Sequence, residues 1–171
     1  MDIKDFLIGP GTSETCEIAL SDDVFECSFG KFPILHKQPV TLALEKLMGR
    51  LHLSGEGSFK FRAACDRCSS DVDIDIDIVI DRYIPIEDGV PVYSDDEDAT
   101  CAFDGFELDG ERLIIEEIVE RWPMKVLCRE DCKGICISCG KNLNDGDCGC
   151  DSFVPDPRMA GFLDILNQLD N

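Results

Sequence analysis

The sequence is poor in basic residues, in histidine and in long apolar segments. Its 16 lysines and arginines face 36 aspartates and glutamates, so the formal net charge is −20. Such a charge repels phosphate backbones and anionic membranes and favours a cationic partner. No segment approaches the roughly 18 apolar residues of a membrane span, and Met1–Gly11 lacks the features of an export signal. These absences predict a soluble, cytoplasmic protein that contacts no membrane.

Signatures of an enzyme are missing as well. The two histidines, His36 and His52, lie neither in a motif with a nucleophile nor near acids at ligand spacing. The sequence also contains no glycine-rich phosphate loop of recognised form. We therefore expect a non-catalytic protein without a small-molecule substrate.

Cysteine, in contrast, is abundant. Six of the eleven cysteines lie between residues 128 and 150, and both Cys65–Cys68 and Cys136–Cys139 have the spacing C-x-x-C. An odd total number of cysteines, clustered as C-x-x-C units in a chain without an export signal, favours metal over disulfides, and four thiolates suit a tetrahedral zinc ion. The alternative is a set of inert or redox-active thiols. Redox pairs lie at helix N-termini, whereas an aspartate-rich strand pattern follows Cys68, which disfavours that alternative.

Eight cysteines remain when Cys16, Cys27 and Cys101, which belong to no cluster, are set aside. Eight is the number that two four-thiolate zinc sites require. The predicted first site comprises Cys136, Cys139, Cys148 and Cys150, and the predicted second site comprises Cys65, Cys68, Cys128 and Cys132. A single zinc ion is the alternative, with Cys128 or Cys132 replacing one member of the C-x-C pair, because two thiolates one residue apart do not always reach the same ion.

Residues 1–125 are predicted to form a mainly antiparallel β domain. Alternating apolar and polar residues predict strands at 50–54, 58–64 and 70–80, with a turn at Gly55–Gly57 between the first two. Shorter apolar runs at 6–8 and 18–20 predict short strands, and residues 42–48 fit either a helical turn or the start of a strand.

A two-residue hairpin loop between Cys65 and Cys68 would set the register of the last two strands. It places Arg62 opposite Asp71 and Lys60 opposite Asp73, so opposite charges meet on one face. The apolar face then contains Phe59, Phe61, Ile74 and Ile76. Asp75 and Asp77 would lie beyond the available bases.

The remaining segments complete an α+β fold. Residues 87–98 carry six acids and no base and predict a mobile acidic loop, which is either a decoy for basic or RNA-binding sites or a solubilising loop. A short helix is predicted near 113–122, ended by Pro123. Residues 126–171 would form a cysteine-rich zinc-binding segment followed by a C-terminal helix that starts at Pro157. The expected fold is thus an antiparallel sheet or partial barrel with a zinc-binding segment flanked by short helices.

Several motifs together resemble one protein family over residues 45–170. They are C-D-R-C at 65–68, C-K-G-I-C at 132–136, C-G at 139–140, N-L-N at 142–144, C-G-C at 148–150 and D-P-R at 156–158. This pattern resembles the bacterial YceD family, the large ribosomal RNA subunit accumulation proteins. The resemblance implies a non-catalytic cytoplasmic protein needed for normal accumulation of large-subunit (23S) rRNA.

The net charge and the resemblance point to different binding partners, because a strongly acidic protein binds phosphate backbones poorly. An indirect action resolves this conflict. We expect the protein to bind a basic ribosomal protein or a large-subunit assembly intermediate, while direct contact with rRNA stays open. The alternative function is a zinc-stabilised acidic adaptor unrelated to ribosomes.

Overall fold

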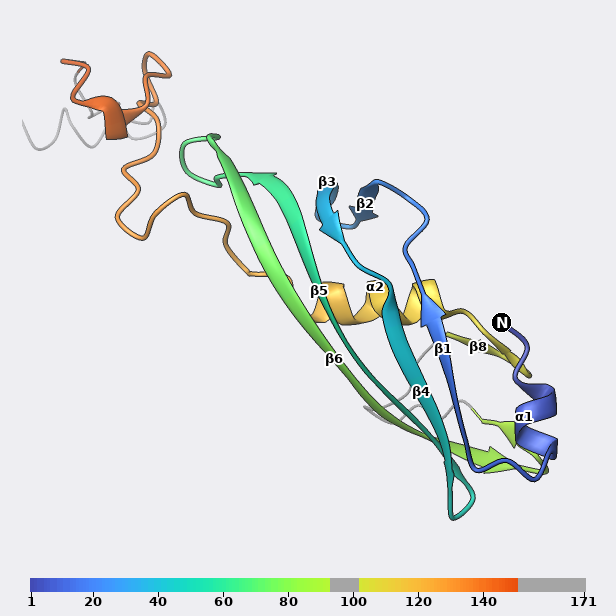
Figure 1. Ribbon diagram of the computed structural model, residues 1–171. Coiled ribbons are helices and arrows are strands. Elements are labelled where there is room, and N and C mark those ends of the chain that lie inside the picture. The colour runs from blue at the N-terminus through green and yellow to red at the C-terminus, as the bar shows by residue number, and fades with distance from the viewer. Residues whose placement is uncertain (93–101, 151–171) are drawn as a thin grey trace, which may run out of the picture. The chain divides into compact units, whose positions relative to one another are not determined.

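The computed structural model describes residues 1–92 and 102–150 of the chain, which form two compact units (Figure 1). The first unit contains Met1–Ala63 and Asp71–Val126, and the second contains Ala64–Ser70 and the residues from Leu127 onward. The predicted C-terminal helix and residues 93–98 of the predicted acidic loop lie outside the described residues. The division into domains at residue 126 stays a prediction.

An antiparallel sheet of seven strands dominates the first unit. Its strands are β1 (Ser13–Ile18), β2 (Val24–Cys27), β3 (Gly30–Lys37), β4 (Val40–Leu47), β5 (Arg50–Ala64), β6 (Asp71–Glu87) and β7 (Val90–Pro91). The order is β1-β4-β5-β3-β2, and β6 pairs with β5 and β7. β4 pairs with the first half of β5, and β3 with its second half. These pairings confirm a mostly antiparallel sheet, and the partial barrel stays a prediction.

Few other elements accompany the sheet. The described residues contain α1 (Lys4–Ile8), α2 (Gly110–Glu120), the small hairpin of β8 (Phe103–Asp104) and β9 (Glu107–Leu108), and the 3₁₀ turn η1 (Leu143–Asp145). No helix in the described part of the chain has the length and apolar character needed to cross a membrane. The predicted strand at 6–8 is wrong, because this segment forms α1 and buries Phe6.

The predicted helix near 113–122 exists as α2 but begins earlier. Asp109 caps its N-terminus by accepting a hydrogen bond from the Arg112 backbone N–H at 3.0 Å. The helix packs with β6 and buries Leu113, Ile114 and Ile118. A capping aspartate ahead of a glycine therefore starts the helix three residues before the apolar pattern does.

The predicted turn at Gly55–Gly57 is wrong, since β5 continues from Arg50 to Ala64. The two glycines instead allow close contact inside the sheet. A Cβ atom on Gly55 would lie 2.9 Å from the Thr41 carbonyl oxygen, and one on Gly57 would lie 2.7 Å from the Val40 side chain. Glycine in this strand thus marks a close approach of β4 rather than a turn.

The predicted ion pairs between β5 and β6 are shifted by two residues. Arg62 pairs with Asp73 at 2.9 Å instead of with Asp71, and Lys60 pairs with Asp75 at 3.1 Å instead of with Asp73. Asp75 is therefore paired, contrary to the prediction.

The length of the connecting loop explains this shift. The Cys65 N–H donates to the Ser70 carbonyl at 2.8 Å, so four residues separate the pair rather than two. A shift by two residues leaves every side chain on its original face. Phe59, Phe61 and Ile76 are accordingly buried as predicted, and Ile74 packs against the core.

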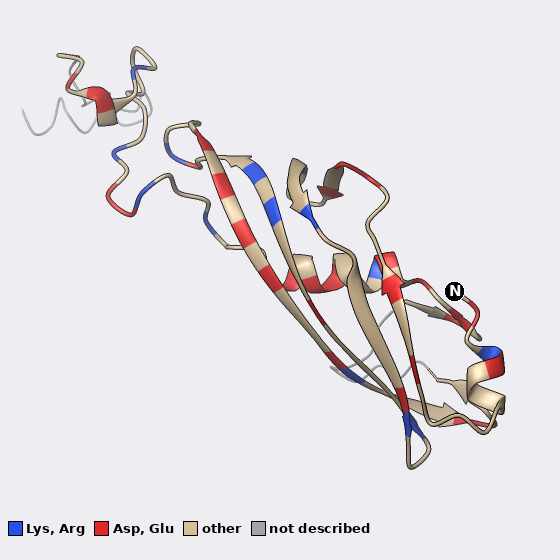
Figure 2. Cartoon of the chain, viewed as in Figure 1, with Lys and Arg blue, Asp and Glu red and all other residues tan. Residues whose placement is uncertain are grey.

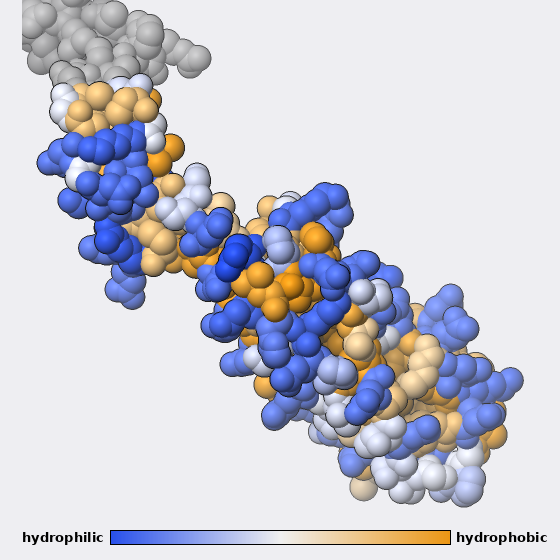
Figure 3. All heavy atoms as spheres, turned by 45° about the horizontal axis from the view of Figure 1, so that its top comes forward, coloured by the Kyte–Doolittle hydropathy of each residue, from blue (hydrophilic) through white to orange (hydrophobic). Residues whose placement is uncertain are grey.

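Charged side chains of the sheet gather on its exposed face. Figure 2 shows acidic bands repeating along β6 beside the basic bands of β5. Figure 3 shows hydrophilic residues over much of the visible surface, with hydrophobic side chains exposed between them. The alternation in the sequence therefore becomes a charged outer face and an apolar core face.

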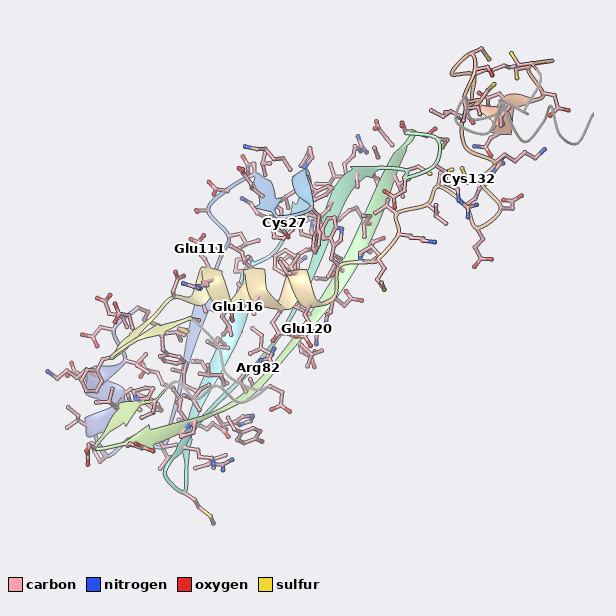
Figure 4. All side chains as sticks on the ribbon, turned by 180° about the vertical axis from the view of Figure 1, so that it is seen from behind. Cys27, Arg82, Glu111, Glu116, Glu120 and Cys132 are labelled. Carbon is pink, nitrogen blue, oxygen red and sulfur yellow. The ribbon has the colours of Figure 1, made fainter. Side chains whose placement is uncertain are left out.

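Among the described residues of the first unit, one acid is buried. Glu117 on α2 is 1% exposed and accepts hydrogen bonds from Arg82 at 2.7 Å and from Arg121. Arg82 also reaches the exposed Glu120 at 3.0 Å (Figure 4). Burial of the Glu117 charge is thus compensated by two guanidinium groups that hold α2 on β6.

Candidate metal centres

Eight cysteines of the second unit form two groups of four. In each group, the four sulfur atoms all lie within 4.8 Å of one another. We call them the loop quartet (Cys65, Cys68, Cys128 and Cys132) and the distal quartet (Cys136, Cys139, Cys148 and Cys150). Cys16 and Cys27 lie in β1 and β2 and belong to neither quartet, and Cys101 is outside the described residues.

The loop quartet brings together residues far apart in the sequence. Cys65 and Cys68 lie on the loop between β5 and β6, and their sulfurs approach Cys132 at 3.8 Å and Cys128 at 3.5 Å. A tetrahedral ion with metal–sulfur bonds of about 2.3 Å has sulfur–sulfur edges of about 3.8 Å. A disulfide would need about 2.05 Å. The sulfur separations of this quartet therefore fit a four-thiolate metal site and not disulfides.

Both C-x-x-C loops have the same backbone hydrogen bonds. The Ser69 N–H donates to the Cys65 carbonyl and the Gly140 N–H donates to the Cys136 carbonyl, each at 2.8 Å. The N–H groups of Cys65 and Cys136 donate in turn to the carbonyls five residues later, on Ser70 and Lys141, again at 2.8 Å. The two segments thus repeat one local fold despite different sequences.

A left-handed residue closes each of these loops. Ser69 has φ 58° and Gly140 has φ 73°. Glycine adopts this conformation without strain, whereas serine carries a small cost. The turn directs backbone N–H groups towards the sulfur of the first cysteine, which is the arrangement that stabilises a thiolate.

Hydrogen bonds shift the pKa values of the thiols in the loop quartet in opposite directions. Burial raises the pKa of Cys65, but backbone N–H groups of Arg67, Cys128 and Cys68 outweigh it and lower this pKa to about 6. The Ser70 side chain lowers the pKa of Cys68. The pKa of Cys128 rises to about 12, first because of its hydrogen bond with the neighbouring Cys68 thiol. These contacts therefore favour the thiolate forms of Cys65 and Cys68 and disfavour that of Cys128.

In the distal quartet, too, one thiol has a lowered pKa and another has a raised pKa. Backbone N–H groups of Cys139 and Ser138 lower the pKa of Cys136 to about 6. The Cys139 and Cys148 side chains raise the pKa of Cys150 to about 12. In both C-x-x-C loops the pKa of the first cysteine is thus lowered, as expected for a thiol surrounded by N–H donors.

Side chains around the loop quartet hold its second half in place. Asn144 donates its side-chain N–H to the Cys132 sulfur at 3.2 Å, and Arg67 donates to the Cys132 carbonyl at 2.8 Å (Figure 4 labels Cys132). Asn142 accepts from both the backbone and the side chain of Asn144, at 3.0 and 2.8 Å. Such outer contacts orient metal ligands and tune their basicity.

Cysteine spacing alone misses these outer residues. Asn142 and Asn144 belong to the N-L-N motif, and Arg67 lies within the first C-x-x-C, so their signal was present only in the motif pattern. Gly134, in C-K-G-I-C, has φ 78°, and a Cβ there would lie 3.1 Å from the Arg67 carbonyl oxygen. This glycine lets the two segments of the loop quartet approach each other closely.

The quartets differ in exposure. Cys65, Cys68 and Cys132 are buried, at 2%, 7% and 3% exposure, and only Cys128 of the loop quartet is exposed. In the distal quartet only Cys136 is buried. Three cysteines of the distal quartet, Cys136, Cys148 and Cys150, line an open cavity of about 530 Å³ together with Ile135, Ile137 and Leu143. Each cluster could hold a metal ion, and the distal one lies more open to solvent.

The comparison with protein families covers both quartets. A family model described as large ribosomal RNA subunit accumulation protein YceD matches residues 53–169, which is over half of the chain and includes all eight clustered cysteines. The chain belongs to the YceD family. No curated protein and no solved structure matches it. The YceD name implies a role in large-subunit rRNA accumulation and describes an accumulation factor rather than an enzyme.

Proposed function

We propose that this YceD protein is a non-catalytic cytoplasmic factor that supports accumulation of 23S rRNA by binding a basic ribosomal protein or a large-subunit assembly factor. The observation that carries the proposal is the row of exposed aspartates on β6, at residues 71, 73, 75 and 77, in a chain of net charge −20. Such a surface attracts cationic proteins and repels rRNA phosphates. Assembly of the large subunit is the process to which the YceD name points.

We further propose that each quartet binds one zinc ion. The sulfur separations near 3.8 Å in the loop quartet and the paired C-x-x-C loops support this. Four cysteine ligands leave no open position for a substrate, so both ions would be structural. Each would carry a net charge of about −2 with its four thiolates, which adds to the acidity of the protein.

Co-purification tests the proposed function. The tagged full-length protein is isolated from its native cells, and the retained proteins are identified before and after RNase treatment. We expect a basic large-subunit protein or assembly factor that resists RNase. Retention of large-subunit proteins only while RNA is intact would instead indicate direct rRNA binding, and retention of an unrelated complex would favour an adaptor function.

A pair of matched variants locates the contact. Asp71→Asn/Asp77→Asn removes two exposed charges from β6, and Glu14→Gln/Glu17→Gln removes two exposed charges from β1. Both variants change the net charge equally. We expect weaker capture of the partner only for the β6 variant. Equal loss in both would show that the partner responds to overall charge and not to this face.

A further inference from the structure

The outer edge of β6 is a long strand edge without a neighbour. In the described part of the chain β6 pairs only with β5 and β7, and β7 reaches only Ile86 and Glu87. Figure 1 shows β6 at the margin of the sheet. Edge strands present unpaired N–H and C=O groups that another strand can bond.

Hydrogen bonds at the far end of β6 show which residues face this edge. The Ile86 N–H donates to the Gly49 carbonyl, on the β5 side, at 2.9 Å. The Pro85 carbonyl accepts instead from Val92, on the outer side, at 2.8 Å. Because backbone directions alternate along an antiparallel strand, odd-numbered residues of β6 point their N–H and C=O groups outward.

Arg121 marks one end of the open stretch. Its guanidinium donates to the Val79 carbonyl at 3.1 Å, which confirms the outward direction of an odd-numbered residue and occupies that position. The stretch from Asp71 to Asp77 contains no proline or glycine and no pairing on its outer side among the described residues. It is long enough for a short strand of common length, about five to seven residues.

Aspartate side chains stand on this same stretch. The outer face of the sheet exposes four of them, Asp71, Asp73, Asp75 and Asp77. Strand β5 shows which side chains pair with these aspartates. Its alternating sequence Lys60-Phe61-Arg62 places bases against Asp75 and Asp73 and an apolar residue in the core. Cross-strand pairs of opposite charge stabilise a sheet, so a second strand with the same alternation fits the other side of β6.

We propose that the β6 edge from Asp71 to Asp77 binds an extended segment of a partner protein with alternating basic and apolar residues, which adds antiparallel to the sheet as a further strand. This inference rests on the proposed function, since it says how a basic partner is held. Backbone hydrogen bonds supply the binding and the aspartates supply the preference for lysine and arginine.

Edge protection is the competing explanation of the aspartates, because charges on an edge prevent aggregation. Protected edges are commonly short, bulged, or interrupted by proline. The open part of β6 has none of these features, and two of its four aspartates lie opposite β5 bases. The arrangement therefore combines an intact backbone edge with a charge pattern that selects one kind of strand.

Methylated peptides test strand addition directly on the full-length protein. The probe is a blocked peptide KVKVKVK, and binding is followed by fluorescence anisotropy. One analogue carries backbone N-methyl groups on the last three lysines and a second carries them on the three valines, so charge and composition are equal. In an antiparallel pair the lysines opposite the aspartates point their N–H groups at β6. We expect lysine methylation to weaken binding at least about tenfold and valine methylation to leave it almost unchanged.

Hydrogen exchange gives a second readout. In the free protein the amides of Asp73, Asp75 and Asp77 should exchange rapidly, while those of Ile74, Ile76 and Ile78 are protected by β5. The peptide should slow the aspartate amides selectively. Absence of peptide binding, equal binding by both methylated analogues, or unchanged exchange at these amides under saturating peptide would each overturn strand addition.

A proline variant of the protein completes the test. Asp77→Pro removes an outward N–H and no bond to β5, and Asp77→Asn removes only the charge. We expect the proline variant to bind the peptide at least about tenfold more weakly than the asparagine variant. If the proline variant fails to fold, the methylated peptides on the unaltered chain still decide. If the peptide does not add to β6 but a large-subunit protein is still captured after RNase treatment, only this inference is overturned. If that capture is lost, the proposed function is overturned.

Discussion

Serine substitution of two loop-quartet cysteines separates the two-zinc arrangement from the single-zinc alternative. Cys65→Ser/Cys68→Ser removes two of the four sulfurs, those that approach Cys132 at 3.8 Å and Cys128 at 3.5 Å. Two remaining thiolates do not complete a four-ligand site, so zinc should fall from about two ions to about one per chain. Cys139→Ser/Cys150→Ser should have the same effect on the distal quartet.

The control substitutes two cysteines outside both quartets, and the assay measures bound zinc. Cys16→Ser/Cys27→Ser changes two half-buried cysteines outside both quartets and should leave about two zinc ions bound. Metal is measured by mass spectrometry on protein purified without added zinc, and X-ray absorption should report four sulfur neighbours at about 2.3 Å. Unchanged zinc in Cys65→Ser/Cys68→Ser would refute the loop site, and absence of zinc from the unaltered chain would refute both.

Three further predictions concern stability. Chelation of zinc should speed amide exchange in residues 64–70 and 127–150 while the sheet, which has its own apolar core, stays protected; simultaneous loss of both would contradict this. Glu117→Gln, which leaves two guanidinium groups without their buried partner, should lower the free energy of unfolding in urea by about 3 kcal/mol, whereas Glu120→Gln, an exposed acid, should change it by less than about 1 kcal/mol. Gly57→Ala should lower the free energy of unfolding by about 1–3 kcal/mol in the same assay, because its Cβ would lie 2.7 Å from the Val40 side chain. Gly11→Ala, in open space, should leave this free energy almost unchanged, and equal effects of the two substitutions would contradict a close approach at Gly57.

Cysteine spacing allowed the two quartets to be formulated from sequence because each C-x-x-C is a local unit. The sequence does not specify how Cys128 and Cys132 reach the loop between β5 and β6, since that depends on the path of some sixty intervening residues. The eight cysteines are gathered as that hypothesis requires, and their role as ligands stays a prediction. Their outer contacts, from Asn144 and Arg67, could not be predicted from spacing because amide and guanidinium groups have many alternative partners.

Period-two alternation identified β5 and β6 and their buried faces, since burial depends on the face and not on the register. The alternation did not predict features that depend on backbone geometry. Gly55 and Gly57 have the composition of a turn but lie inside β5, and the loop after Cys65 is longer than the spacing of its cysteines suggests. The short apolar run at 6–8 fits a strand and a helix equally well, and α1 forms there.

The ratio of large-subunit to small-subunit rRNA in cells depleted of this protein tests the central claim most directly. Depletion should lower the ratio, and the unaltered chain and Glu14→Gln/Glu17→Gln should restore it. Asp71→Asn/Asp77→Asn, which weakens the acidic face of β6, should restore it less completely. An unchanged ratio after depletion would contradict the proposed role, and full restoration by the β6 variant would contradict the role of that face.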